Sequence, residues 1–448
     1  MFSMSSEIHL LAERSVPRYT SYPTAPHFHA GIGPDTYTSW LGGLPRAAAL
    51  SLYLHIPFCR ALCLYCGCNT KAVRRQEPVD DYVAALKAEI GIVSRHLQSQ
   101  PVGHWHWGGG TPSMLSPDQF LELRDELARH LDLSAVHEHA IELDPRYVTS
   151  ELVAGLIRIG VNRASLGVQD LAPDVQRAIG RIQSYETVAR ATDTLRDGGI
   201  TAINFDLMYG LPRQTVESIR DTAEQVCALA PARIALFGYA HVPWFKKQQR
   251  LIDAAELPGV RARLTQMEAA QQVFLEHGYC AVGIDHFAAP DDSLAMAATA
   301  GRLHRNFQGY TTDEAVALIG LGASAIGRLP QGFIQNAPDV GGYTRAVAAG
   351  RPAIVRGIAL SEQDRCRGAL IERLMCDMHV DLREFAGDTD TDFQSEREAL
   401  RPYIAGGLVI AEPSRIVVTA KGRPYLRLIA AAFDTYLAAG KAAHSRAV

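Results

Sequence analysis

The chain has 448 residues, of which 47% are hydrophobic and 21% are charged. A chain of this size can bury a large core and favours two or three domains. The formal net charge of −4 excludes the overall basic character that nucleic-acid binders usually show. No stretch approaches the roughly 18 apolar residues that cross a bilayer, and residues 1–14 lack the basic start and apolar run of a signal peptide. We therefore expect a cytoplasmic protein without a membrane or nucleic-acid partner.

The first segment, residues 1–47, precedes the first predicted strand. Within it Arg18 stands beside Tyr19 and Tyr22, and a proline lies on each side of this group. This composition favours docking, so we expect the segment to contact the mouth of the domain that follows. The alternative for Arg18 is an ordinary solvated arginine.

Residues 48–357 form the predicted central domain. Up to residue 242, short apolar runs alternate with longer amphipathic stretches such as 80–96. This alternation is typical of repeated βα units around a parallel sheet. Six units in series predict an incomplete (β/α)6 barrel of the α/β class. The expected strands are residues 50–56, 104–107, 140–143, 164–168, 202–208 and 234–239.

Unusual polar or glycine-rich clusters follow the predicted strands. In barrels of this kind the chemistry gathers at the carboxyl ends of the strands. The first strand runs into three cysteines, the second into a run of glycines, and the next two into acidic and amide side chains. These residues are Cys59, Cys63 and Cys66, then 108–112, then Glu142 with Asp144, and Gln169 with Asp170. We expect them to surround one site.

The thiols of Cys59, Cys63 and Cys66 are spaced C-x3-C-x2-C on one short loop. A [4Fe–4S] cluster normally takes four thiolates, so three leave one iron open to another ligand. The alternative is a zinc site with Cys68 as fourth ligand, but structural zinc ligands usually come as two separated pairs. We therefore interpret Cys68 as a thiol near the cluster. The other four cysteines are scattered, which favours buried apolar roles.

A glycine run, Gly108-Gly109-Gly110, follows the second predicted strand. Three glycines let the backbone approach a ligand closely, because no Cβ stands in the way. The loop lacks the lysine of a phosphate-binding P-loop. Together with the cysteine loop one βα unit earlier, it favours the methionine end of S-adenosylmethionine (SAM) as ligand.

A dinucleotide fingerprint, G-x-G-x-x-A, spans residues 320–325. It requires a strand, a helix and a second parallel strand to bind NAD. The pattern after it continues no such unit, and the region follows a full set of barrel units. We therefore expect no NAD site here.

Residues 358–448 form a smaller predicted domain. Ser361 with Asp364 predicts a capping box for a helix that extends to about Met378. A hairpin over 407–419 and a helix over 422–437 complete an α+β, winged-helix-like order. Such domains often bind DNA, but acidic and basic residues roughly balance here, which favours a packing or lid domain.

These motifs together resemble the radical SAM superfamily. From about residue 17 to 437 the sequence is similar to the HemN-type coproporphyrinogen III dehydrogenase family. The marks of this resemblance outside the generic core are Pro17–Ala25, Cys66-Gly67-Cys68-Asn69 and His304–Tyr310. The resemblance implies that residues 48–357 are a radical SAM catalytic domain with a barrel extension.

The resemblance implies a set of binding residues. Cys59, Cys63 and Cys66 would hold one [4Fe–4S] cluster, and the family binds one SAM at its open iron and a second SAM nearby. The residues that would contact the first SAM are Tyr53, Gly109, Glu142 and Arg181, and the matching positions around both SAM sites include Tyr65, Gly110, Thr111, Gln169, Asp206, Ala240 and Ile326. Related sequences can have Phe at the position of Tyr65.

The candidate catalytic residues are Tyr53, Cys68 and Arg18. Structural alternatives remain open for several site residues. Glu142 and Asp206 could instead accept loop amides, Arg181 could lie on a helix surface, and Tyr53 could belong to the core.

The implied reaction is the oxidative decarboxylation of two propionates of coproporphyrinogen III to vinyl groups, giving protoporphyrinogen IX without oxygen through a 5'-deoxyadenosyl radical. Four substrate carboxylates require cations, for which the candidates are Arg18, His304 and Arg305. We also expect a monomer that is reduced by a small electron-transfer protein, and Lys246, Lys247 and Arg250 could receive an acidic reductase.

Two relatives in the superfamily are alternatives. Haem-binding chaperones keep the cluster and SAM loop without decarboxylating a substrate, and they typically lack the segment that begins at Arg18. Haem-degrading radical SAM methyltransferases are the other class. The presence of the segment favours the dehydrogenase.

Overall fold

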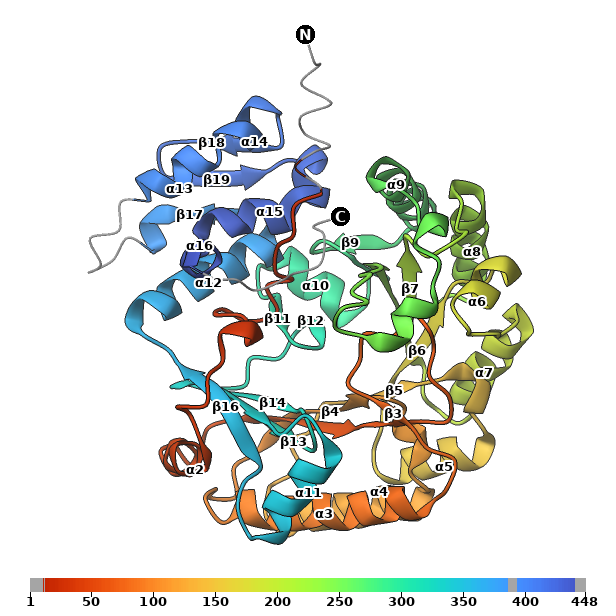
Figure 1. Ribbon diagram of the computed structural model, residues 1–448, viewed down its shortest axis with the longest axis vertical. Helices are drawn as coiled ribbons and strands as arrows, with labels where there is room; N and C mark the ends of the chain where they lie inside the picture. The colour runs from red at the N-terminus through yellow and green to blue at the C-terminus, as the bar shows by residue number, and fades with distance from the viewer. Residues whose placement is uncertain (1–10, 12, 386–392, 440–448) are drawn as a thin grey trace.

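The barrel wall consists of six neighbouring parallel strands, all of which the sequence predicted. The computed structural model describes residues 11, 13–385 and 393–439. The six strands are β1 (Leu50–Ile56), β4 (Val102–Gly109), β5 (Glu138–Leu143), β6 (Arg163–Gln169), β7 (Ala202–Tyr209) and β8 (Arg233–Gly238). Helices cover the outside of this wall, and the sheet does not close on itself (Figure 1). The α/β fold with an incomplete barrel is therefore confirmed.

Six further strands extend the sheet at its two edges. β13 (Ala317–Leu321) pairs in parallel with β1, and the strands beyond it are antiparallel: β14 (Ile326–Leu329), β15 (Gly332–Asn336) and β16 (Ile354–Ala359). At the other edge, β10 (His286–Ala288) pairs antiparallel with β8, followed by β9 (Cys280–Val282). The sheet thus has twelve strands.

The helices of the barrel follow the strands in sequence. Several begin with a serine or threonine whose side chain accepts a bond from a backbone amide of the first turn, as Ser116 and Thr215 do in capping boxes. The helices are α3 (Glu77–Ser94), α4 (Pro117–Ala128), α5 (Ser150–Arg158), α6 (Pro173–Ala178), α7 (Tyr185–Asp197), α8 (Val216–Ala228) and α9 (Val260–Glu276).

Short elements occupy the connections. The helical ones are η1 (Ala25–His27), α2 (Pro34–Gly42), η2 (Pro112–Met114), η3 (Pro145–Tyr147), η4 (Lys247–Leu251), η5 (Ala254–Glu256), α10 (Ser293–Thr299) and α11 (Val340–Ala348). The extended ones are β2 (Phe58–Cys59), β3 (Lys71–Ala72), β11 (His304–Asn306) and β12 (Gly309–Thr311).

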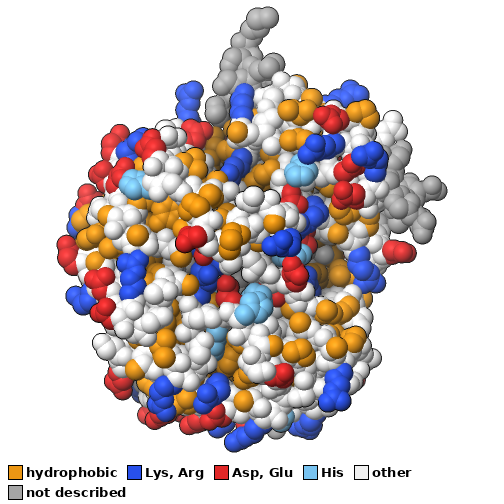
Figure 2. Space-filling view, turned by 180° about the vertical axis from the view of Figure 1, so that it is seen from behind, with side chains coloured by type: hydrophobic (Ala, Val, Ile, Leu, Met, Phe, Trp, Pro, Cys, Tyr) orange, Lys and Arg blue, Asp and Glu red, His pale blue; other side chains and the backbone are white. Residues whose placement is uncertain are grey.

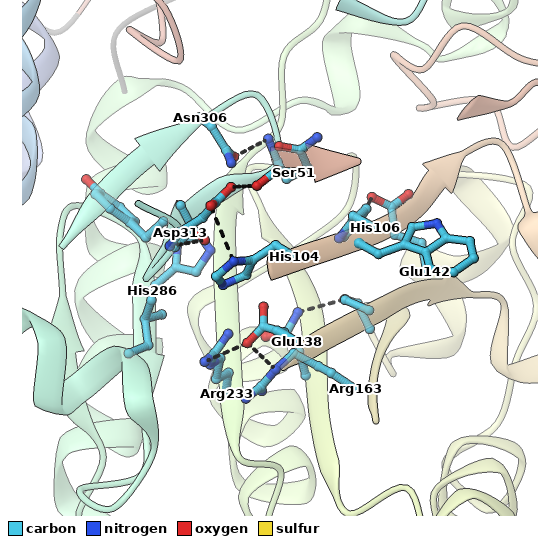
Figure 3. Close-up of a pocket in the computed structure, with 18 of the residues that line it drawn as sticks. Ser51, His104, His106, Glu138, Glu142, Arg163, Arg233, His286, Asn306 and Asp313 are labelled. Atoms are coloured by element: carbon cyan, nitrogen blue, oxygen red, sulfur yellow. Dashed lines mark hydrogen bonds and ion pairs between the residues drawn. The ribbon is translucent and has the colours of Figure 1, made fainter. Parts of the chain in front are cut away.

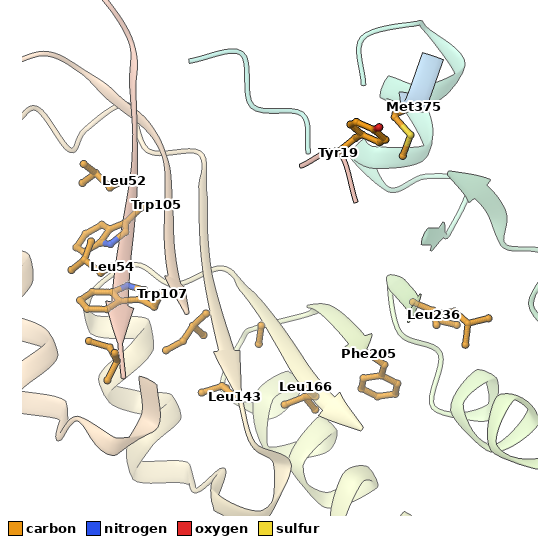
Figure 4. Packing of buried hydrophobic residues seen from close by; sticks show 14 of the residues in the cluster. Tyr19, Leu52, Leu54, Trp105, Trp107, Leu143, Leu166, Phe205, Leu236 and Met375 are labelled. Carbon is orange, nitrogen blue, oxygen red and sulfur yellow. The ribbon is translucent and has the colours of Figure 1, made fainter. Parts of the chain in front are cut away.

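The barrel strands alternate between apolar and polar side chains. In β4, Trp105 and Trp107 are at most 2% exposed in the core, whereas His104 and His106 line a cavity inside the barrel. Because successive strand residues point to opposite faces, this alternation gives an apolar layer beneath the helices and a polar interior. Figure 4 shows part of the apolar layer, which includes Leu52, Leu54, Trp105, Trp107, Leu143, Leu166, Phe205 and Leu236. Burial of each such side chain contributes roughly 1.5–3 kcal/mol.

The G-x-G-x-x-A segment connects β13 to β14. The turn leads within a few residues into an antiparallel strand, with no helix between the two. The carboxylate of Glu89, on α3, holds this turn: it accepts hydrogen bonds from the Gly322 amide at 2.6 Å, Asn336 Nδ2 at 2.6 Å and the Tyr343 hydroxyl at 2.7 Å. The fingerprint is therefore part of the hairpin between β13 and β14, which belongs to the sheet extension beside β1.

The C-terminal domain is α+β. The capping box of Ser361 with Asp364 begins α12 (Glu362–Asp377) as expected, and Met378 follows the helix in a left-handed conformation. The expected hairpin is β18 (Val409–Ala411) with β19 (Arg415–Val418), and β17 (His379–Asp381), which the sequence did not indicate, adds a third strand. The remaining helices before the hairpin are α13 (Gln394–Ala399) and α14 (Arg401–Ala405).

The helix expected over 422–437 is wrong. The segment is broken into η7 (Ala420–Tyr425), α15 (Leu426–Ala430), η8 (Ala431–Phe433) and α16 (Thr435–Ala439). Two residues account for the breaks. Pro424 has no amide hydrogen to donate within a helix, and Asp434 adopts an extended conformation and accepts a bond from the Tyr436 amide.

The N-terminal segment runs between the barrel and the C-terminal domain (Figure 1). The Tyr19 hydroxyl donates to Asp434 at 3.0 Å, and the Tyr22 hydroxyl bonds the Thr435 hydroxyl at 3.0 Å. On the barrel side, Arg18 Nη2 donates to the Gly238 carbonyl at the end of β8. The segment therefore joins both parts of the fold, while the division at residues 47 and 357 stays a prediction. None of the helices in the described ranges is long and apolar enough to cross a membrane.

We predict that Glu89→Ala destabilises the protein by about 3 kcal/mol. The change leaves three buried donors without an acceptor, and each unsatisfied group costs about 1–3 kcal/mol, partly relieved by rearrangement. Thermal unfolding at neutral pH measures the effect, with the exposed Glu217→Ala on α8 as control. An unfolding temperature equal to that of the control would contradict the prediction.

Candidate functional site

One cavity of about 530 Å³ opens at the carboxyl ends of the barrel strands. It gathers residues from five strand ends, the cysteine loop and the N-terminal segment. Most of the residues expected at the site line it: Arg18, Cys59, Cys63, Tyr65, Cys66, Cys68, Gly109, Gly110, Thr111, Glu142, Gln169, Arg181, Asp206 and Ala240. The rule that strand ends meet at one edge accounts for this convergence.

Hydrogen-bond donors surround the thiols of the cysteine loop. The Thr111 hydroxyl donates to Cys59 Sγ at 3.4 Å, and Arg181 Nη1 donates to Cys63 Sγ at 3.5 Å. The Cys68 amide donates to Cys66 Sγ at 3.4 Å. Such donors favour thiolates, the form that binds iron.

The thiols differ in acidity. A hydrogen bond from the Cys68 side chain, against the effect of burial, lowers the pKa of Cys66 to about 6. Burial raises the pKa of Cys59, and the hydrogen bond to Cys66 raises that of Cys68. Within residues 13–385 and 393–439, no three His, Cys, Asp or Glu side chains converge closely enough to hold one metal ion. A cubane requires less convergence, because each thiolate binds a different iron.

The glycine run packs directly against the cysteine loop. Gly109 has a φ of +112°, and a Cβ on Gly110 would lie 2.5 Å from both the Phe58 carbonyl and the Thr70 hydroxyl. The Gly110 and Thr111 amides donate to carbonyls of the first strand and cysteine loop at 2.8 and 2.7 Å. Close approach by the chain itself, and not only by a ligand, therefore requires these glycines.

Two of the acidic residues that line the cavity, Glu142 and Asp206, differ in protonation. Burial alone would raise the pKa of Glu142, but hydrogen bonds with His106 and from the Gly109 amide hold that pKa below its usual value. Burial raises the pKa of Asp206 to about 6, even though Ser165 donates to its carboxylate at 2.9 Å. Glu142 is thus ionised at neutral pH, while Asp206 takes up a proton near pH 6.

Arg181 is buried and does not lie on a surface, so the alternative interpretation for it is wrong. Its side chain is 7% exposed and donates to Asp144 at 3.2 Å and to the Gly167 carbonyl at 2.7 Å. Its Nε is buried without a hydrogen-bond partner. Asp144 is also paired with Arg146 at 2.7 Å, so the one carboxylate is shared by two guanidinium groups.

Two expected site residues do not line this cavity. Tyr53 lies in the adjoining strand β1, where its hydroxyl bonds His55 Nδ1 at 3.0 Å and its ring stacks on His106. Ile326 begins β14 and packs beside Phe333. β1 and β13 are paired at Tyr53 and Gly320, so both residues lie on the side of the site nearest the sheet extension.

Sequence reasoning missed the residues that support the acidic groups. His106 and Ser165 hold Glu142 and Asp206, and Phe237 lines the cavity beside them. Strand alternation could have found His106, because it stands two residues before Gly108 and therefore shares its face. No local signal points to Phe237.

A second cavity of about 190 Å³ lies inside the barrel and shares Glu142, Ser165 and Asp206 with the first. Figure 3 shows His104 and Asp313 pointing toward one another, and their atoms are 3.3 Å apart. Arg163 pairs with Glu138 at 3.1 Å, and Arg233 pairs with Asp292 at 2.7 Å. The charges of this chamber are largely balanced by pairing, and buried charges usually are.

The outer surface carries no single dominant charge on the face in Figure 2, where basic and acidic side chains are interspersed. The net charge of −4 agrees with this distribution.

Two family models match the chain. The one described as Radical SAM superfamily matches residues 53–226, and the one described as HemN C-terminal domain matches residues 360–425.

Known proteins are similar over nearly the whole chain. The oxygen-independent coproporphyrinogen III oxidase of Bradyrhizobium diazoefficiens is 48% identical over 97% of this chain and 98% of its own length. The Escherichia coli K12 protein of the same name is 39% identical over 94% of this chain and 93% of its own. A solved structure, coproporphyrinogen III oxidase (HemN) from Escherichia coli, covers 94% of this chain and 100% of its own with a TM-score of 0.89 and 38% identity.

We predict that Asp206→Asn stabilises the ligand-free protein at pH 8 but not at pH 4. The folded-state pKa of Asp206, about 6, exceeds the ordinary value of 3.8, so stability is lost as pH rises through this range. The ionised carboxylate then costs on the order of 2–3 kcal/mol at pH 8. Thermal unfolding at both pH values measures the difference, with the exposed Asp118→Asn as control. A variant less stable than the parent at pH 8 would contradict the assignment.

Proposed function

Because the chain belongs to the oxygen-independent coproporphyrinogen III oxidase family of radical SAM enzymes, we propose that it converts coproporphyrinogen III to protoporphyrinogen IX without oxygen. Each of two propionate side chains loses one hydrogen atom to the 5'-deoxyadenosyl radical, then carbon dioxide and one electron, which passes to a one-electron acceptor, and so becomes a vinyl group. The observation that carries the proposal is the single cavity in which three C-x3-C-x2-C thiols meet Glu142 and Arg181.

The donor set fits a [4Fe–4S] cluster and SAM. Cys59, Cys63 and Cys66 would each bind an iron, which leaves the fourth iron for SAM. When bound and reduced, the cluster supplies the electron that cleaves SAM to methionine and a 5'-deoxyadenosyl radical. The buried, unpartnered Nε of Arg181 is a polar atom that a ligand in the cavity could satisfy.

The chain's own groups suit the parts of SAM. Ionised Glu142 can accept hydrogen bonds from an ammonium group, and Arg181 can donate to a carboxylate. Asp206 can accept from ribose hydroxyls. We assign Tyr53, Gly109, Glu142 and Arg181 to the first SAM, and the residues around both sites are Tyr65, Gly110, Thr111, Gln169, Asp206, Ala240 and Ile326. The cavity volume of about 530 Å³ exceeds what the cluster alone would fill, which supports SAM binding beside the cluster.

Cys68 and Arg18 are proposed to act on the reacting substrate. Both line the cavity of about 530 Å³ that contains the three thiols, which we call the cluster cavity. The Cys68 thiol stays protonated and holds its proton beside the cavity, because its hydrogen bond to Cys66 and burial raise its pKa. Arg18 offers a cation to a propionate carboxylate. Among the described residues of the N-terminal segment, Arg18 lines the cavity, so the segment lies at the edge of the cavity.

The alternatives within the superfamily are less favoured. Haem chaperones typically lack the segment at Arg18, which here contacts both the barrel and the C-terminal domain. The proteins with which this chain aligns over its length are named as oxidases. We also propose that the enzyme acts in the cytoplasm as a monomer.

The test is anaerobic turnover. Reconstituted enzyme with dithionite, SAM and coproporphyrinogen III is expected to form protoporphyrinogen IX and 5'-deoxyadenosine. Cys59→Ala should lose about four irons and all turnover, whereas the exposed Cys280→Ala should keep both. Deoxyadenosine without decarboxylated product would refute the proposed substrate, and full iron content in Cys59→Ala would refute the cluster assignment.

We further propose that a small acidic electron-transfer protein docks over residues 244–251, which include η4. This segment lies on the cysteine loop: Lys246 Nζ donates to the Cys68 carbonyl at 2.8 Å and Gln248 Nε2 to the Cys66 carbonyl at 2.7 Å. Its outer face combines exposed Lys247 and Arg250 with the exposed apolar residues Trp244, Phe245 and Leu251. An apolar patch with basic residues suits an acidic partner.

Charge reversal tests this docking surface. Lys247→Glu with Arg250→Glu should slow turnover driven by a reduced acidic flavodoxin about tenfold, and should leave dithionite-driven turnover unchanged because dithionite needs no docking. The control is Arg190→Glu with Arg220→Glu on α7 and α8, which changes the net charge equally. An equal loss with both reductants would contradict the proposal.

A further inference from the structure

A third cavity, of about 170 Å³, adjoins the cluster cavity and is rich in arginine. Arg18, Arg263, Arg305 and Arg427 line it. These residues come from the N-terminal segment, α9, β11 and α15. Among the described residues that line this cavity, Asp285 is the only acidic one. We call this group the arginine pocket.

Asp285 is the one carboxylate among the described residues that line the arginine pocket. Asp285 is already 2.7 Å from His286, and that contact, with the nearby arginines, holds its pKa to about 2 against the effect of burial. Burial, followed by repulsion from Arg18, lowers the pKa of Arg427 to about 9. Buried like charges are costly unless a counter-charge is present.

Some guanidinium hydrogens near the pocket have no acceptor. Nε and Nη1 of Arg305 are buried without a hydrogen-bond partner, and so are Nε and Nη2 of Arg423, whose neighbour Pro424 lines the pocket. The barrel chamber of Figure 3 differs in charge, because Arg163 and Arg233 each have a carboxylate partner there. The arginine pocket therefore has the charge and donors of an anion site.

The arginine pocket is continuous with the cluster cavity. Arg18, Phe237, Tyr239 and Ala240 line both. Arg18 is therefore shared by the arginine pocket and the cluster cavity. A ligand with one carboxylate in the arginine pocket can thus extend past Arg18 toward the cluster.

We infer that the arginine pocket binds a propionate carboxylate of the porphyrinogen other than the one that reacts. The inference rests on the proposed function and names how that substrate is recognised. A volume of about 170 Å³ holds a propionate arm but not a tetrapyrrole, whose rings must lie in the larger cavity. His304, the other sequence candidate for this role, is already paired with Glu372 at 3.2 Å.

A structural role is the competing explanation. Arg427 donates to the carbonyls of Val16 and Pro17, and Arg305 donates to the carbonyl of Arg18 at 3.3 Å. These bonds hold the N-terminal segment. They use only part of the guanidinium of Arg305, so the same side chain can both hold the segment and bind a carboxylate.

Equilibrium binding separates the two roles. Holoenzyme without SAM cannot turn over, so its affinity for coproporphyrinogen III and for the tetramethyl ester can be compared anaerobically by ultrafiltration. Arg18→Gln and Arg305→Gln should each weaken binding of the free acid about 10–100-fold, the range for one charge-assisted contact, and should change binding of the ester less than about twofold. Arg18→Lys should recover part of the preference. The control is the exposed Arg302→Gln.

Each outcome decides the inference. Equal weakening of the acid and the ester would assign the arginines a purely structural role, and unchanged binding of both would remove them from the site. Failure of the proposed function is distinguishable, because it would leave the wild-type protein without decarboxylated product whatever its preference for the free acid.

Discussion

The alternation of side chains along the parallel strands is the constraint on which the rest of the structure depends. Each strand sends one set of residues outward into an apolar layer and the other inward, where His106, Glu142 and Asp206 meet. Because the inner set is polar, the barrel encloses a cavity lined by charged and polar side chains. The cysteine loop and glycine run sit at the end of this space, and their position follows from the lengths of β1 and β4.

Charge is handled differently in the two parts of this interior. Inside the barrel, Arg163 pairs with Glu138 and Arg233 pairs with Asp292. The positive charges of these two arginines are therefore balanced by carboxylates of the chain itself. Beside the N-terminal segment, four arginines line a cavity in which Asp285 is the only acidic residue among the described lining residues. This difference separates the barrel chamber, whose ion pairs support the fold, from the arginine pocket, which we propose binds an anionic ligand.

The sequence predicted most of what local patterns encode. Apolar runs located all six barrel strands, the C-x3-C-x2-C spacing located the thiols, and Ser361 with Asp364 located a helix start. What it could not predict depends on distant contacts. The helix over 422–437 breaks where Asp434 meets Tyr19, more than 400 residues away, and the arginine pocket combines four elements that share no local motif. Tyr53 and Ile326 came from resemblance alone and lie beside the main cavity.

The N-terminal segment contacts residues that lie late in the sequence, and this contact has a consequence for biosynthesis. Tyr19 and Tyr22 are made first, but their partners Asp434 and Thr435 leave the ribosome near the end of translation. The barrel can therefore fold while its mouth is still uncovered. An inorganic cluster delivered during that interval would meet an open path to the cysteine loop, and release of the finished polypeptide would shut it.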